Sequence, residues 1–410
     1  MNYLSGALSY IAGNDAPPSP SSSSTVSAIS RLVDRTASSA LPADRRSAVT
    51  SLAELALRGP DAQREIGVRG LKVLYAVIEQ DAAHEDTVTA ALTLLARICG
   101  AASVAADNTA AWVALDGAVD LILGAVDVDD AGTRAAALDA LAALLDANAD
   151  AAVPPLLDAS PPPAGRLLEA TRDAEPGVRL RALGVLAATA GASAAAAAAL
   201  ASADGYGRLL DVADACVDNA LHEGGPAEAA HQAAVLAAAV TAVNAMLAAG
   251  GAAGAAAARR SRAVPRLGCL SAGVTSEVLG LAFDAGGDGG GGGGGAPPRG
   301  VPPLPPDVRV AALMAVAALA RGHPPTHTLF PSAGVLPPPE TPHSAGASAL
   351  AASPYACVRA ATAVALGASL SAPAGSAPGE VSAEWQAALG GGGGGGKRGG
   401  LALRRRRMRA

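Results

Sequence analysis

The segment ISRLVDRTASSALPADRRSAVTSLAEL, from Ile29 to Leu55, sets the pattern that the rest of the chain repeats. One apolar stripe at helical spacing begins at Ile29, and a second stripe of the same kind ends at Leu55. Between them, Pro42 stands where a proline can open a new helix, because the first residue of a helix needs no N–H donor. Each half therefore predicts an amphipathic helix that must pack its stripe against a neighbour.

The second half of this segment returns along the chain as a repeated unit. An arginine or an equivalent residue is followed by apolar residues four and seven positions later, beginning at Arg45, Val88, Arg134, Arg179 and Arg309. The first four of these anchors are 43, 46 and 45 residues apart. A period in the low-to-mid forties, built of paired helices, is typical of armadillo and HEAT repeats. The sequence therefore predicts an all-α protein with an armadillo/HEAT-like α-solenoid, rather than a helical bundle.

Composition divides the chain into a repeat region and segments of low complexity. We expect residues 1–24 to form an N-terminal segment and flexible spacer, and residues 25–283 to form armadillo-like repeats. Residues 284–306 are rich in glycine and proline, which predicts a linker. Further armadillo-like helices are expected at 307–370, and a disordered basic tail at 371–410.

Individual residues mark the expected helix starts and bear on membrane insertion. Thr25 is a candidate N-cap of the first helix, and Asp130 and Pro176 stand where later helices should begin. The uncharged stretches 182–203 and 232–258 are long enough to span a bilayer, but their apolar content is mostly alanine. Because both stretches also keep the repeat register, we expect them to be helices of the solenoid.

Charge and the chemistry-bearing residues exclude several classes of function. The formal net charge of −6 argues against a general nucleic-acid binder. Residues Gly391 to Lys397 have the outline of a phosphate-binding loop, but Arg398 stands where a serine or threonine is needed. The four cysteines show no CxxC spacing, which suits buried thiols in a reducing compartment better than a zinc site or disulfides. No catalytic or metal-ligand set is recognisable, so we expect a non-enzymatic protein without a cofactor.

A more specific indication comes from residues 32–55, LVDRTASSALPADRRSAVTSLAEL, and residues 68–81, VRGLKVLYAVIEQD. Together with the opening MNYL, they resemble the N-terminal armadillo head of the general vesicular transport factors, the Uso-type Golgi vesicle tethers. The pattern of that family is a DRxASSxLxxDRRxAVxxL-like segment. The matching positions here are Asp34, Arg35, Ala37, Ser38, Ser39, Leu41, Asp44, Arg45, Arg46, Ala48, Val49 and Leu52. The resemblance is close through about residue 100 and continues more weakly to about residue 370.

The resemblance implies a vesicle-tethering factor in ER-to-Golgi and intra-Golgi transport, cytoplasmic and peripheral on Golgi membranes and transport vesicles. It implies a Rab-type small GTPase as a partner, together with SNAREs and golgins. Family members are homodimers with a long coiled coil and an acidic tail, and the absence of both from this sequence argues against the homodimer. The alternative is a generic armadillo-repeat adaptor, either import-receptor-like or a chaperone cofactor. With only Trp112 and Trp385, the tryptophan–asparagine ladder of import receptors is missing.

Three arginines in the resembling region are the candidate partner-binding residues: Arg31, Arg35 and Arg46. We choose them because the apolar stripes of the two predicted helices leave these side chains pointing outward. The competing interpretation of each is an ordinary solvated charge on the surface of a helix.

Overall fold

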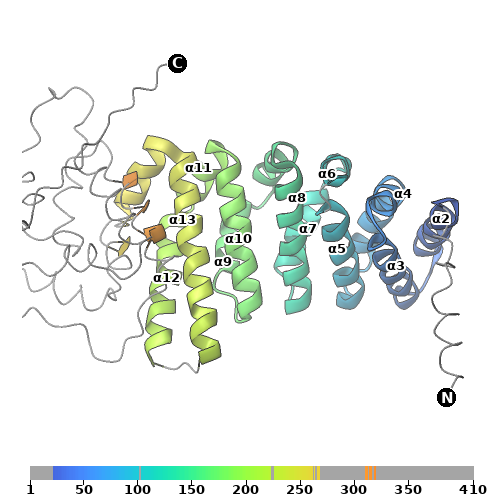
Figure 1. The fold of residues 1–410 in the computed structure, drawn as a ribbon, viewed down its shortest axis with the longest axis horizontal. Coiled ribbons are helices and arrows are strands. Elements are labelled where there is room, and N and C mark those ends of the chain that lie inside the picture. The colour runs from blue at the N-terminus through green and yellow to red at the C-terminus, as the bar shows by residue number, and fades with distance from the viewer. Residues whose placement is uncertain are drawn as a thin grey trace, which may run out of the picture.

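The computed structural model describes residues 22–100, 103–222 and 226–261, with single residues between 263 and 267 and between 310 and 319. Within these ranges every regular element is a helix, and the helices stand side by side in one elongated array (Figure 1). The linker predicted at 284–306 and the tail predicted at 371–410 lie outside the described residues. So do residues 1–21 and most of the helices predicted at 307–370.

The helices follow one another with short connections. Their bounds are α2 (Ser22–Ser38), α3 (Pro42–Ala56), α4 (Pro60–Gln80), α5 (Glu85–Cys99), α6 (Ala105–Val113), α7 (Ala118–Val126), α8 (Ala131–Asp158), α9 (Pro163–Ala170), α10 (Pro176–Ala192), α11 (Ala194–Ser202), α12 (Gly205–His222) and α13 (Pro226–Arg260). This order shows a repeated unit, in which one or two helices precede each member of the series α3, α5, α8 and α10.

The series α3, α5, α8, α10 and α13 forms the spine of the array, since each of these helices packs on the next (Figure 1). The apolar residues that the repeated pattern singled out face this packing. Leu52, Leu95, Leu141 and Leu186, seven positions after their anchors, are all at most 2% exposed. Burying a leucine side chain contributes about 1.5–3 kcal/mol, so these positions carry much of each interface. The predicted α-solenoid is confirmed.

The helix starts agree with the sequence at three points and differ at one. Pro42 and Pro176 open α3 and α10, and the Asp130 carboxylate caps α8 by accepting a hydrogen bond of 2.6 Å from Thr133 N. The expectation that Thr25 caps the first helix is wrong, because Thr25 lies inside α2, whose described part starts at Ser22. An N-cap residue has non-helical backbone angles, whereas Thr25 is helical.

Two of the described helices are long and apolar enough to cross a membrane by length and composition, Ala131–Asp158 and Ala230–Arg260. A third such span results if the bent pair Ala105–Val113 and Ala118–Val126 is taken as one. Both long helices are broken inside the solenoid, α8 at Asn148 and α13 at Gly251, whose φ of +53° suits only glycine. In the array, α8 packs on α5 and α10, and α13 packs on α10 and α12.

The uncharged stretch 182–203 is not one continuous helix. Its first part ends α10, and Ser193 then turns the chain and caps α11, with its hydroxyl accepting a hydrogen bond of 3.1 Å from Ala196 N. Ala196 and Leu200 are buried on the inner face of α11. The expectation that this stretch forms helices of the solenoid is confirmed.

Candidate interaction site

The three arginines chosen from the sequence are all exposed near the N-terminal end of the described solenoid. Arg31 Nε donates to Ser27 O, one turn earlier in α2, at 3.3 Å. Arg35 forms an ion pair with Asp44 at 3.5 Å across the α2–α3 turn. Arg46 pairs with Asp86 of α5. Their role in partner binding stays a prediction, and two of the three already serve contacts between helices.

A different set of arginines connects successive repeats through partly buried contacts. Arg45, near the start of α3, donates through Nε and Nη2 to the two carboxylate oxygens of Asp81, the residue that ends α4. Arg134, at the same position of α8, donates to both oxygens of Asp173 at 2.7 and 2.8 Å. We call the pairs Arg45–Asp81 and Arg134–Asp173 the Arg–Asp ladder. The aspartates lie 36 and 39 residues after their arginines, in the loop just before the next helix of the series, α5 or α10.

Each arginine of the series also binds the backbone of its own repeat. Nη1 donates to the carbonyl oxygen six residues earlier: Ser39 O at 2.6 Å from Arg45, Val128 O at 2.9 Å from Arg134, and Asp173 O at 2.9 Å from Arg179. One guanidinium therefore fixes the loop before its own helix, and in the ladder pairs it also fixes the loop of the following repeat. Bidentate pairing of this kind is stronger and more directional than a single hydrogen bond.

The ladder shifts the ionisation of its members. Hydrogen bonds from Arg134 and Glu175 N lower the pKa of Asp173, although burial of the carboxyl opposes them and is the largest single effect. The hydrogen bond to Asp81 raises the pKa of Arg45, and the hydrogen bond to Asp173 raises the pKa of Arg134. The ladder carboxylates are also shielded, with side-chain exposures of 2% for Asp81 and 9% for Asp173. These pairs are structural contacts rather than a free surface.

The repeat between the two ladder pairs lacks the arginine. Val88 of α5 occupies the position of Arg45 and Arg134, and it is buried with 4% exposure. Asp127, which ends α7, lies 39 residues after Val88 and so takes the place of Asp173. With no arginine at residue 88, the Asp127 carboxylate instead pairs with Arg166 of the following repeat at 3.1 Å.

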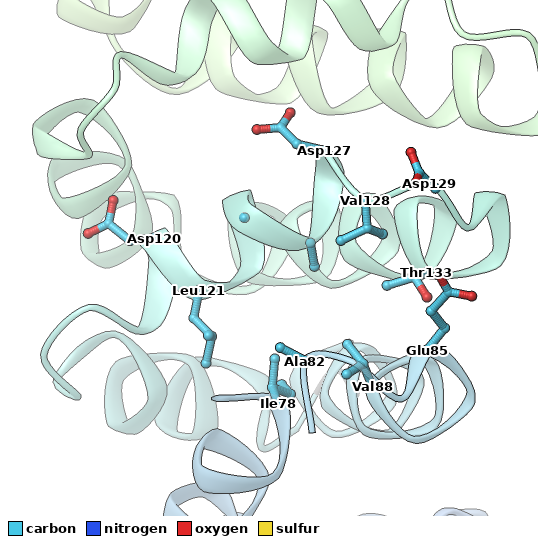
Figure 2. A pocket seen from close by; sticks show the side chains of 12 residues that line it. Ile78, Ala82, Glu85, Val88, Asp120, Leu121, Asp127, Val128, Asp129 and Thr133 are labelled. Carbon is cyan, nitrogen blue, oxygen red and sulfur yellow. The ribbon is translucent and has the colours of Figure 1, made fainter. Parts of the chain in front are cut away.

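A pocket of about 570 Å³ lies at this point, between α4, α5, α7 and the start of α8. Figure 2 shows Ile78, Ala82 and Val88 on one side of it, with Leu121 and Val128 facing them. Of the described residues that line the pocket, four are acidic and none is basic: Glu85, Asp120, Asp127 and Asp129. We call this the Val88 pocket.

Among the residues that the structure describes, neither a metal-ligand group nor a reactive thiol is found. No group of three or more His, Cys, Asp or Glu side chains among the described residues could hold a metal ion. Burial raises the pKa of the Cys99 thiol to about 12 and that of Cys216 to about 11. Both thiols are therefore protonated near neutral pH and are poor nucleophiles. Cys269 and Cys357 lie outside the described residues.

The repeat spacing predicts Arg45, Arg134 and Arg179 as anchors of the repeat and Val88 as an equivalent position, but it does not predict the ladder or the pocket. The signal that could have revealed the pocket is the aspartate that follows each position by 36 or 39 residues. It is present after Val88 as Asp127, although the arginine that it would bind is missing.

Comparisons with known proteins bear on the fold. No family model matches the chain, and no curated protein matches it in sequence. A designed armadillo repeat protein is 18% identical and aligns over 71% of this chain and 99% of its own length, with a TM-score of 0.51. Computationally designed armadillo repeat proteins for modular peptide recognition give 18% identity, 72% and 99% coverage, and a TM-score of 0.51. The Uso1-2 structure gives 15% identity, 86% coverage of this chain and 62% of its own, with a TM-score of 0.47.

The likenesses to the two designed proteins establish an armadillo-like repeat fold. At 18% identity the two designed proteins show the fold alone, and they agree with the helix series and the period described above. The chain is an armadillo-like repeat protein, an architecture that exposes long surfaces built from successive repeats.

Proposed function

We propose that this chain is the head of a vesicle-tethering factor in ER-to-Golgi and intra-Golgi transport, and that it binds a Rab-type small GTPase. The observation that carries the proposal is the match of the segment from Asp34 to Leu52 to the pattern of the Uso-type tethers. An armadillo-like fold is consistent with it, because tethering of this kind needs an interaction scaffold and no catalysis. SNAREs and golgins are further partners under the same proposal.

The geometry separates the matched segment into residues that hold the fold and residues that are free to bind. Val49 and Leu52 are buried in the core, and Arg45 belongs to the ladder. Ser38 and Ser39 close the end of α2, since their hydroxyls donate to Asp34 O at 2.7 Å and to Arg35 O at 2.6 Å. The match is therefore explained in part by structure alone.

The rest of the matched segment forms a candidate contact surface at the α2–α3 turn. Leu41, in this turn, is 62% exposed. Arg35 and Arg46 lie on the helices to either side of it and are exposed. An apolar side chain bordered by arginines has the composition found at protein interfaces, where arginine is enriched. The proposed location is cytoplasmic, on the surface of Golgi membranes and vesicles.

The test is a pull-down of the full chain with immobilised Golgi Rab proteins, each loaded with a GTP analogue or with GDP. We expect retention by at least one Rab in its GTP form only. The double variant R35A/R46A should weaken that retention about tenfold, equivalent to about 1.4 kcal/mol. R64A is the matched control, since Arg64 is 55% exposed but lies in α4 outside the matched segment.

The opposite result supports the alternative function. If no Rab retains the chain in a nucleotide-dependent way, and a tagged chain does not concentrate at the Golgi, the tethering proposal fails. The generic adaptor then takes its place. One observation favours that alternative independently, since the designed proteins of the same fold were made for modular peptide recognition. Binding of extended peptides without any Rab would be the expected behaviour.

A further inference from the structure

We propose that the Val88 pocket binds the side chain of an arginine from a partner protein, which occupies the place that Arg45 and Arg134 occupy in the neighbouring repeats. The inference stands on the repeat register and the pocket, and it does not depend on the tethering role. Its partner is identified by chemistry alone: a peptide segment that presents an arginine.

The two positions that supply acceptors to the guanidinium in the ladder are also present around Val88. In the ladder, the carbonyl oxygen six residues before the arginine accepts from Nη1, and that position before Val88 is Ala82, which lines the pocket. In the ladder, the carboxylate in the loop before the next helix of the series accepts from Nε and Nη2. The residue at that position for Val88 is Asp127, which also lines the pocket. The same positions thus bind a guanidinium in the repeats on both sides.

The residues that line the pocket match the chemistry of an arginine side chain. Val88, Leu121 and Val128 give the interior an apolar surface, on which the aliphatic part of an arginine can lie. The Glu85 side chain also lines the pocket and has no side-chain hydrogen bond or ion pair within the part of the chain that the structure describes. An arginine combines an apolar stem with a planar cation, and lysine cannot reproduce the bidentate contact.

Asp127 already has a partner, Arg166. Its carboxylate is 48% exposed and is turned toward Arg166, and in Figure 2 it points away from Val88. An ion pair this exposed contributes at most about 1 kcal/mol, so a second guanidinium can share or replace it by rotation of one side chain. The ladder shows that a loop carboxylate of this kind can serve two neighbours, since Asp173 accepts from Arg134 and from Glu175 N.

The experiment fills the pocket from inside the chain. In V88R the new arginine should complete the ladder with Ala82 O and Asp127, and so exclude an external arginine. V68R is the matched control, because it adds the same side chain at a valine that is 78% exposed and outside the pocket. The probe is a short Gly/Ser peptide with one arginine, and a lysine version of the same peptide. Binding to the methyl-labelled full chain is followed by NMR shifts at Leu121 and Val128, which every variant keeps, and at Val88 in the wild type and V68R.

We expect the arginine peptide to shift these methyl signals in the wild type and in V68R. The V88R variant should bind the arginine peptide about tenfold more weakly than the wild type does. The wild type should bind the lysine peptide about tenfold more weakly than the arginine peptide. Equal binding by V88R, or equal binding of the two peptides, overturns the proposal. Should V88R not fold, the double variant E85Q/D127N must weaken binding while its circular dichroism stays that of the wild type, and unchanged binding again overturns it.

A truncation tests whether the arginine in the pocket comes from a partner or from the chain itself. The chain has its own arginines near its C-terminal end, at Arg398, Arg404 to Arg407 and Arg409. A chain ending at residue 396 should bind the peptide as the full chain does. If the truncation itself shifts the Val88 and Leu121 methyl signals and strengthens peptide binding, the occupant is the chain's own terminus. The assignment to a partner is then overturned.

Discussion

Gly67 of α4 lies so close to Asn108 of α6 that a Cβ at residue 67 would stand 2.6 Å from Asn108 Cγ. Asn108 is 3% exposed, and its side-chain amide donates to Ile98 O at 2.9 Å and to Gln63 O at 3.4 Å. One buried amide thus links α4, the end of α5 and α6. It reaches those carbonyls only because residue 67 has no side chain.

We therefore expect G67A to destabilise the fold, although alanine favours helix. The new methyl group must push Asn108 away from its carbonyl partners, which adds overpacking to a lost buried hydrogen bond. Together they should lower the free energy of unfolding by about 1–3 kcal/mol. G184A in α10 is the matched control, because a Cβ there meets nothing within 4 Å. It should raise the stability by about 0.4–1 kcal/mol. Urea unfolding measures both, and equal effects of the two variants would contradict the argument.

The ladder pair Arg134–Asp173 gives a second prediction. R134A leaves the Asp173 carboxylate, 9% exposed, without its bidentate donor, and leaves Val128 O and Asp129 O unpaired. We expect a loss of about 2–4 kcal/mol in the free energy of unfolding. R181A removes a pair of similar length, Arg181–Asp139, whose partners are 42% and 49% exposed. It should cost less than about 1 kcal/mol. A loss from R134A no larger than that from R181A would show that the ladder does not hold the repeats together.

The same pair makes part of the stability depend on pH. The pKa of Asp173 is lowered in the folded chain, so its contribution is present above the unfolded carboxyl value of about 3.9. It is lost as the pH falls through the folded value. D173N should therefore be less stable than the wild type at pH 7, and the difference should shrink below about pH 4. Urea unfolding at several pH values measures the difference, and D139N should show little at any pH. A gap that widens in acid would contradict the sign.

How far the sequence predicts this structure depends on the range of the interaction. The spacing of Arg45 and Leu52, which recurs in later repeats, predicts the helices and their stacking. The reason is that the apolar stripe of an amphipathic helix must pack against a neighbouring helix. Asp130 and Pro176 mark helix starts through contacts within a few residues. The Val88 pocket depends on Asp127, which is 39 residues away in sequence and becomes a neighbour only when the repeats stack. Periodicity identifies which positions of successive repeats are equivalent. Where one repeat carries a different residue, as at Val88, the neighbours of that residue are known only from the three-dimensional structure.

The core positions of the spine should carry most of the stability. L138A removes a side chain with 0% exposure from the α5–α8–α10 interface. Because the surrounding helices can close the cavity only in part, we expect a loss of about 2–5 kcal/mol. L57A is the control, since Leu57 is 69% exposed, and its effect should stay within about 0.5 kcal/mol. Similar losses from the two variants in urea unfolding would place the core elsewhere.

The reaction rates of the two buried thiols, Cys99 and Cys216, should report how often the repeats open. Cys99 is 0% exposed and Cys216 5% exposed, and burial raises their pKa values to about 12 and about 11. Both must therefore leave the core before they can form the thiolate that reacts with Ellman's reagent. In the variant C269S/C357S we expect no rapid reaction at pH 8, and release of both thiols once urea unfolds the chain. V68C, added to this variant at a residue 78% exposed, should react at once. Reaction of Cys99 or Cys216 as fast as that of V68C would show that the repeats open freely, since the fraction that reacts reports local unfolding.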